Sequence, residues 1–97
     1  MPELSEQKRR ILITDDSDIN RMMLVEMLSQ DYELIEAADG DEAMEILKEH
    51  GDTIDLMLLD CVMPKMDGFS VLMEMDRLWW KVNIPVIMIS EIGRAHV

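Results

Sequence analysis

The stretch that decides the fold is Asp55–Gly68, which reads DLMLLDCVMPKMDG. Its first part has a continuous Leu-Met-Leu-Leu interior, which is typical of a short strand covered on both faces of a sheet. The strand should end at Asp60, and Pro64 and Gly68 then favour a loop. A helix should begin at about Asp67 or Gly68. This order of strand, loop and helix predicts one unit of an α/β fold.

The rest of the chain repeats the same order. Three further strands are predicted at Arg10–Asp15, Leu34–Ala38 and Ile84–Ser90. Strands that alternate with helices predict a doubly wound parallel sheet with helices on both faces. We therefore expect the order (βα)3β within one small domain, since a chain of 97 residues is large enough for one core only.

The predicted helices carry recognisable start and stop signals. Ser17-Asp18 offers side-chain oxygens to cap the first helix. Asp39 and Glu42 have the spacing of a capping box, and Gly51 is a usual helix terminator. Four apolar residues recur at helical spacing on the first helix, and we expect the methionines mostly to fill the core. These four residues are Ile19, Met22, Met23 and Met27.

Composition indicates which classes of partner and which cellular compartment to expect. The chain has 21 acidic and 9 basic residues and a formal charge of −12, which opposes direct binding of nucleic acid or an anionic membrane. Its apolar runs are too short to span a bilayer, and no apolar secretory segment follows its first charges. A single cysteine, Cys61, fits a reducing compartment. We expect a cytoplasmic protein without a membrane partner.

Three carboxylates stand at the ends of predicted strands. Asp15 and Asp16 close the first strand, and Asp60 closes the third. In an open parallel sheet, ligands bind in the crevice beyond the carboxyl ends of the strands. Three carboxylates in one crevice would repel each other unless a cation lay between them, and oxygen ligands of this kind suit Mg²⁺. A phosphoryl group bridging that ion is the expected substrate.

The chain resembles the receiver domain of two-component response regulators over Lys8–Ser90. The resemblance rests on the Asp15-Asp16 pair, on the motif Asp-x-x-Met-Pro-x-Met-Asp-Gly at Asp60–Gly68, and on an apolar fourth strand that ends in Ser90. It implies a flavodoxin-like fold of five βα units, of which (βα)3β is present. The family's fifth strand and last two helices have no counterpart here, so we expect residues 1–90 to be an incomplete receiver domain.

The resemblance also implies a role for each site residue. Asp60 would be the phosphoacceptor, and Asp15, Asp16, Asp60 and the backbone carbonyl of Val62 would bind Mg²⁺. Ser90 would donate its hydroxyl to the phosphoryl group and couple phosphorylation to a rearrangement. The implied partner is a sensor histidine kinase or a phosphotransfer protein, and a second receiver domain is a further candidate. No nucleic acid is expected to bind this segment.

The last residues have a different character. The segment Ile92–Val97, IGRAHV, reads as one frame of a widely used short-read sequencing adapter. We expect residues 91–97 to be a non-native tail.

Two other functions compete with this one, and the chain is not expected to be an enzyme. A small Mg²⁺-dependent phosphohydrolase needs a second aspartate two residues past the nucleophile, where this chain has Val62 after Asp60 and Ser17 after Asp15. A degenerate receiver domain that serves as an interaction module stays open as an alternative.

Overall fold

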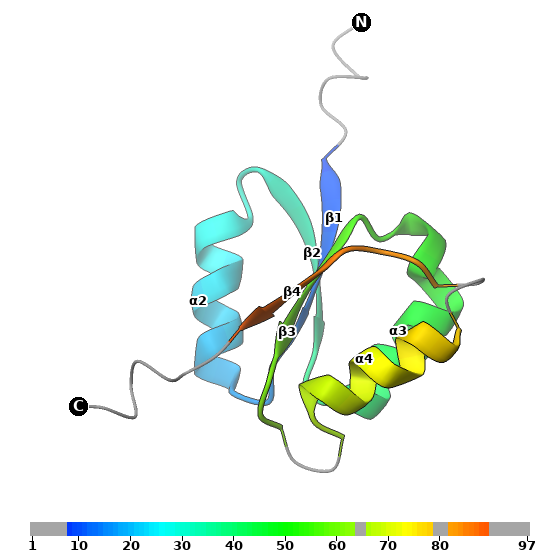
Figure 1. Cartoon of the computed structure of the whole chain (residues 1–97). Coiled ribbons are helices and arrows are strands. Elements are labelled where there is room, and N and C mark those ends of the chain that lie inside the picture. The colour runs from blue at the N-terminus through cyan, green and yellow to red at the C-terminus, as the bar shows by residue number, and fades with distance from the viewer. Residues whose placement is uncertain (1–7, 64–65, 79–81, 90–97) are drawn as a thin grey trace, which may run out of the picture.

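The computed structural model describes residues 8–63, 66–78 and 82–89. Within them, four strands form a parallel sheet in the order β2-β1-β3-β4 (Figure 1). The elements are β1 Arg9–Thr14, α2 Asp18–Leu28, β2 Tyr32–Ala37, α3 Gly40–His50, η1 Gly51–Thr53, β3 Leu56–Asp60, α4 Gly68–Arg77 and β4 Val86–Ile89. The doubly wound α/β class is confirmed, and each strand begins within two residues of its predicted start.

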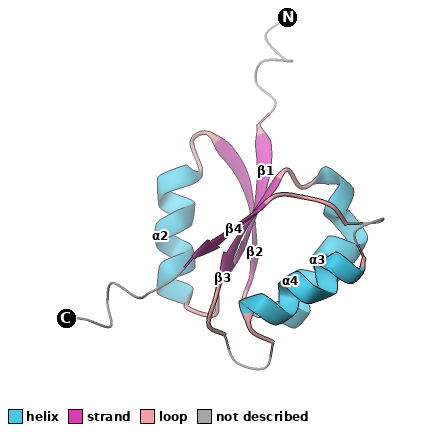
Figure 2. Ribbon diagram, in the orientation of Figure 1, coloured by secondary structure: helices cyan, strands magenta, loops and turns pink. Residues whose placement is uncertain are grey.

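The helices lie on both faces of the sheet, α2 on one face and α3 with α4 on the other (Figure 2). Successive side chains of a strand point to opposite faces, so β1 contributes to two separate cores. Leu12 packs beneath α3 and α4 with Leu47, Leu59 and Val71. The smaller core beneath α2 is built on Ile11, Ile13 and Leu58.

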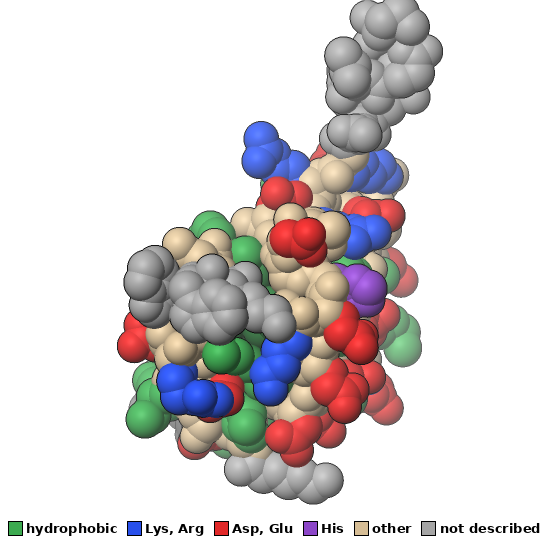
Figure 3. Space-filling view, turned by 90° about the vertical axis from the view of Figure 1, so that its right-hand side faces the viewer, with side chains coloured by type: hydrophobic (Ala, Val, Ile, Leu, Met, Phe, Trp, Pro, Cys, Tyr) green, Lys and Arg blue, Asp and Glu red, His purple; other side chains and the backbone are tan. Residues whose placement is uncertain are grey.

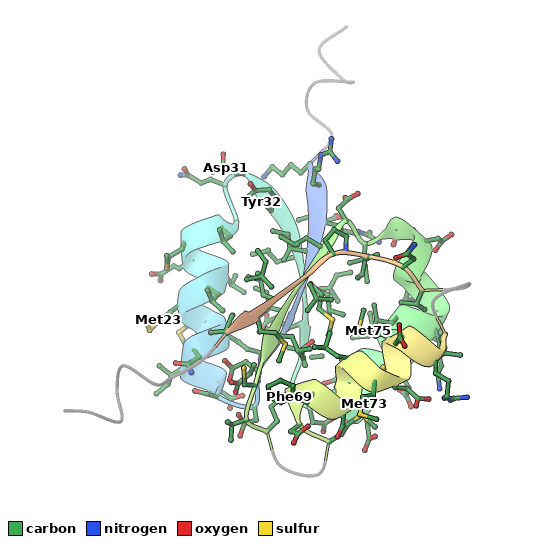
Figure 4. The ribbon with its side chains drawn as sticks, in the orientation of Figure 1. Met23, Asp31, Tyr32, Phe69, Met73 and Met75 are labelled. Carbon is green, nitrogen blue, oxygen red and sulfur yellow. The ribbon has the colours of Figure 1, made fainter. Side chains whose placement is uncertain are left out.

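The inward face of α2 differs from the expectation. The four residues that recur at helical spacing are more than half exposed, and Met23 points away from the sheet in Figure 4. The helix packs on the sheet through Leu24, Val25 and Leu28 instead. Apolar residues occupy nearly every side of this helix, so spacing alone did not distinguish its buried side. The expectation that the methionines mostly fill the core is wrong for this helix: the exposed side chains are Ile19, Met22, Met23 and Met27.

The predicted helix starts are confirmed by their hydrogen bonds. The side chains of Ser17 and Asp39 accept from the backbone amides three residues later, at 3.2 Å and 2.8 Å. Glu42 reaches back to the amide of Ala38 at 2.7 Å, one residue before the partner of an ideal capping box. Asp67 caps α4 in the same way, because it accepts from the amide of Ser70 at 2.8 Å.

The sheet contains a buried hydroxyl at the end of β1. Thr14 is fully buried at the end of β1, and its Oγ1 has no hydrogen-bond partner among the described residues. A buried polar group left in this state costs about 1–3 kcal/mol.

The surface is predominantly acidic, as the formal charge of −12 requires. Figure 3 shows the side of the molecule that carries α3 and α4, where Asp and Glu side chains gather along one border. No helix within the described ranges is both long enough and apolar enough to cross a membrane.

Candidate functional site

The structure brings the three predicted carboxylates together. One carboxylate oxygen from each of Asp15, Asp16 and Asp60 lies within 4.8 Å of the other two. Asp15 and Asp60 are 2% and 4% exposed, whereas Asp16 is open to solvent. Parallel pairing of β1 with β3 explains this, because Thr14 lies opposite Leu59 and both strands end at the same edge. That edge is the lower one in Figure 2, where β1 leads into α2 and β3 into the loop before α4.

Backbone contacts fix Asp15 at the end of β1. Its amide donates to the carbonyl of Ala37 at 3.1 Å, which continues the pairing with β2 by one residue. Its carboxylate oxygen Oδ1 accepts from the amide of Ser17 at 2.8 Å, and this bond closes the turn into α2. The turn thereby sets the orientation of the Asp15 carboxylate within the cluster.

The end of β3 holds Asp60 in a similar way. The next amide, that of Cys61, donates to the carbonyl of Ile89 on β4 at 3.0 Å. Asp60 Oδ1 accepts from the amide of Val62 at 3.3 Å. The carbonyl of Cys61 accepts from the amide of Gly68 at 3.1 Å, so the start of α4 returns to the strand end.

Gly68 permits this return because it has no side chain. A Cβ at this position would lie 2.4 Å from the backbone oxygen of Asp60 and 3.0 Å from Cys61 Cα. Real Cβ atoms essentially never approach within 3.0 Å, so any other residue must displace backbone. The glycine that shapes the loop in the predicted motif therefore packs directly on the strand end that carries Asp60.

The donor set fits Mg²⁺. Three carboxylates within 4.8 Å of one another repel, and two of them are largely removed from water. A divalent cation would offset this repulsion, and Mg²⁺ is usually bound by one or two carboxylates together with water and phosphate oxygens. The exposed position of Asp16 leaves one side of the cluster open for such ligands.

Two predicted site residues remain untested by the geometry. Val62 lies in the loop after β3 and is 78% exposed, and the role of its carbonyl stays a prediction. Ser90 lies outside the described residues, as do Pro64 and Lys65 of the motif.

Arg21 is a site residue that sequence reasoning missed. Its side chain is only 14% exposed and reaches from α2 to the turn after β1. There it donates through Nη1 to the carbonyl oxygen of Asp15 at 2.6 Å, and it pairs with Asp18 and Glu36. Burial by itself lowers the pKa of Arg21, but hydrogen bonds to these two carboxylates and their charges outweigh it and raise the pKa. The spacing of three residues between Asp18 and Arg21 was a signal for that pair alone.

Comparison with known proteins gives consistent matches. The sequence model of one protein family, the response regulator receiver domain, matches residues 11–96 of this chain. The probable transcriptional regulator ycf27 of Cyanophora paradoxa is 40% identical over 88 residues, which cover 89% of this chain and 34% of that protein. The two-component response regulator ARR14 of Arabidopsis thaliana is 37% identical over 89% of this chain and 22% of that protein. The chain thus spans about a third or less of these relatives.

Solved structures match over most of the chain. The CheX-CheY-BeF3-Mg+2 complex from Borrelia burgdorferi contains a chain that is 38% identical, with a TM-score of 0.77, over 94% of this chain and 68% of that one. The N-terminal domain of a response regulator receiver protein from Methanoculleus marisnigri JR1 is 36% identical, with a TM-score of 0.75, over 81% of this chain and 63% of that one.

Proposed function

Because this chain belongs to the family of response regulator receiver domains of two-component systems, we propose that it accepts a phosphoryl group on Asp60. The observation that carries the proposal is the convergence of Asp15, Asp16 and Asp60 at one edge of the sheet. Asp60 ends β3 and is buried, as Asp15 is, whereas Asp16 is open to solvent. In this proposal, Asp15 and Asp16 bind Mg²⁺ with Asp60 and the carbonyl of Val62.

The negative charge of Asp60 is the reason that this proposal includes a cation. A carboxylate is a poor nucleophile toward a phosphoryl group, because both are negatively charged. Bound Mg²⁺ would supply positive charge that offsets this repulsion and stabilises charge on the transferring oxygens. An oxygen of Asp60 then bonds to phosphorus while the P–N bond of the donor phosphohistidine breaks, and the released imidazole takes up a proton.

Phosphorylation would change the charge of the site. An ionised carboxylate becomes an acyl phosphate with about −2 of its own, so the site gains roughly −1. We propose that the hydroxyl of Ser90 responds to this change and biases a rearrangement beyond β4. In the intact protein, Ser90→Ala should leave Mg²⁺ affinity nearly unchanged and weaken phosphorylation-dependent output. Equal output from the variant and the parent protein would remove Ser90 from this role.

The partner in this proposal is a sensor histidine kinase or a phosphotransfer protein, and a second receiver domain is a further candidate. The related complex from Borrelia burgdorferi contains BeF3 and Mg+2, which supports the choice of a phosphoryl group and Mg²⁺ as ligands. Several relatives are named as transcriptional regulators, so regulation of transcription is the proposed output of the whole protein. The acidic segment described here would receive the signal rather than bind DNA.

Phosphorylation can be tested with a small acyl-phosphate donor. The chain is incubated with acetyl phosphate and Mg²⁺, trapped with borohydride and mapped by peptide mass spectrometry. We expect modification of Asp60 that disappears in Asp60→Asn. Asp67→Asn is the matched control, because it lies in the same motif, is exposed and can still cap α4. A parent chain that stays unmodified would favour the interaction module instead.

The metal can be tested separately by calorimetric titration with Mg²⁺. Asp16→Asn removes one charge from the cluster and should weaken binding markedly. Asp41→Asn removes one charge from the exposed first turn of α3 and should leave the affinity unchanged. If Asp16→Asn binds Mg²⁺ as tightly as the parent chain, the metal assignment is wrong.

A further inference from the structure

Arg21 connects three parts of the fold that meet beside the carboxylate cluster. Its Nη1 donates to the carbonyl oxygen of Asp15, the residue directly after β1. Its Nε donates to Glu36 Oε1 on β2 at 3.2 Å, and its Nη2 pairs with Asp18 in the first turn of α2. The rigid guanidinium fork thereby sets the distances among these three acceptors.

The contact with the Asp15 carbonyl bears directly on the direction of Asp16. This carbonyl belongs to the peptide unit that joins Asp15 to Asp16, and a peptide unit is planar. Its preceding neighbour, the peptide that carries the Asp15 amide, is already bound to Ala37 on β2. Arg21 also binds Glu36, the residue of β2 that precedes Ala37. Both peptide units are therefore held against β2, the first directly and the second through Arg21. Fixing the second unit restricts where the exposed carboxylate of Asp16 can lie.

We infer that Arg21 is a positioning residue for the Mg²⁺ site, which acts by holding the Asp15–Asp16 peptide unit so that Asp16 faces Asp15 and Asp60. The inference rests on the proposed function, since it needs a cluster that binds Mg²⁺. Groups that orient metal ligands from behind typically contribute 10- to 100-fold to metal affinity. Arg21 is held by Asp18 and Glu36, so its own positive charge is largely balanced.

Two substitutions distinguish positioning from charge. Arg21→Met removes the charge and all three hydrogen bonds. Arg21→Lys keeps the charge but replaces the planar fork with a single ammonium, which cannot reach three acceptors in the same geometry. Positioning predicts that both variants bind Mg²⁺ about 10-fold more weakly than the parent chain. A simple charge effect predicts tighter binding by Arg21→Met, because a positive charge near the site is lost, and no change in Arg21→Lys.

A matched control separates this role from general destabilisation. Arg77→Met removes an arginine that pairs with Glu74 three residues earlier on α4, away from the cluster, and should leave Mg²⁺ affinity unchanged. Glu36→Gln preserves the shape of the tether on β2 and should weaken Mg²⁺ binding less than Arg21→Met. Titrations are made by calorimetry at a temperature at which circular dichroism shows each variant to be folded.

The outcomes separate the inference from the proposed function. Weaker binding by Arg21→Met and Arg21→Lys, with parent-like binding by Arg77→Met, supports it. Parent-like or tighter Mg²⁺ binding by Arg21→Met would overturn the positioning role while leaving the proposed function intact. A parent chain that binds no Mg²⁺ would overturn both. If Arg21→Met does not fold, Arg21→Lys and Glu36→Gln provide the test. Parent-like Mg²⁺ affinity in both variants would refute the positioning role of Arg21.

Discussion

Replacing Gly68 with alanine should disturb the end of β3 more than the addition of one methyl group suggests. The new Cβ would lie 2.4 Å from the backbone oxygen of Asp60, whereas ordinary contacts of this kind begin near 3.4 Å. The two atoms must therefore separate by about 1 Å. Because the nearest atoms belong to the backbone of Asp60 and Cys61, the strand end itself has to move.

The expected cost follows from this displacement. Overpacking of a tightly packed site typically destabilises a protein by about 1–3 kcal/mol. Total stabilities of small domains are only about 5–15 kcal/mol, so the loss should be obvious in urea unfolding. A reacting group misplaced by about 1 Å can lose roughly 100-fold in rate. We therefore expect Gly68→Ala to slow phosphorylation by acetyl phosphate by about this factor under conditions in which it remains folded.

Gly51→Ala provides a matched control within the same chain. Gly51 has φ −57° and ψ −29°, a conformation open to any residue, and an added Cβ would meet only Val82 at 3.7 Å. Here alanine should stabilise the protein by about 0.4–1 kcal/mol, because it restricts the unfolded chain. Unfolding midpoints in urea and phosphorylation rates are compared for the parent chain and both variants. Equal stability and equal rates for Gly68→Ala and the parent would refute the close approach.

Three further predictions concern the packing and the caps, and each is checked by urea unfolding. Asp39→Ala should lower the free energy of unfolding by about 1 kcal/mol, since it removes the cap of α3, while Asp41→Ala in the same turn should have little effect. Leu12→Ala should cost about 2–5 kcal/mol because Leu12 is fully buried, whereas the exposed Met23 should tolerate Met23→Gln within about 0.5 kcal/mol. Thr14→Val should stabilise the protein by about 1 kcal/mol, because it removes a buried hydroxyl that has no hydrogen-bond partner in the part of the chain that the structure describes; a loss of stability would show that this hydroxyl is satisfied.

Local sequence patterns were sufficient to predict the sheet and the carboxylate cluster. The apolar run before Asp60 and the acidic pair after β1 are contiguous in the sequence, and parallel pairing necessarily brings their ends to one edge. The caps at Ser17 and Asp39 are equally local, because donor and acceptor are three residues apart. Such features depend on neighbours in the chain and hardly on the final packing.

The features that the sequence did not predict depend on contacts between segments distant in the sequence or on which side of a helix faces the sheet. Arg21 donates to the carbonyl of Asp15 and to the carboxylate of Glu36. Glu36 is fifteen residues away on β2, and no sequence spacing encodes that contact. The buried side of α2 was not predicted either, because the choice between Met23 and Leu24 is made by how the helix lies on the sheet. A Cβ on Gly40, the first residue of α3, would likewise lie 2.7 Å from the backbone oxygen of Met66, and only the packing of α3 against the loop before α4 reveals this contact.

The limited burial of α2 has a consequence for the motions of the molecule. No side chain of α2, which lies wholly within the described residues, is fully buried, whereas α3 buries three side chains and α4 buries those of Val71 and Met75. Segments with few buried apolar contacts open at a lower free energy than the core strands. The amide protons of α2 should therefore exchange with solvent deuterium sooner than those of β1 and β3. Since α2 begins only three residues after Asp15, each such opening would loosen the loop that carries Asp16, and cation binding at the cluster should slow the exchange of the first turn of the helix.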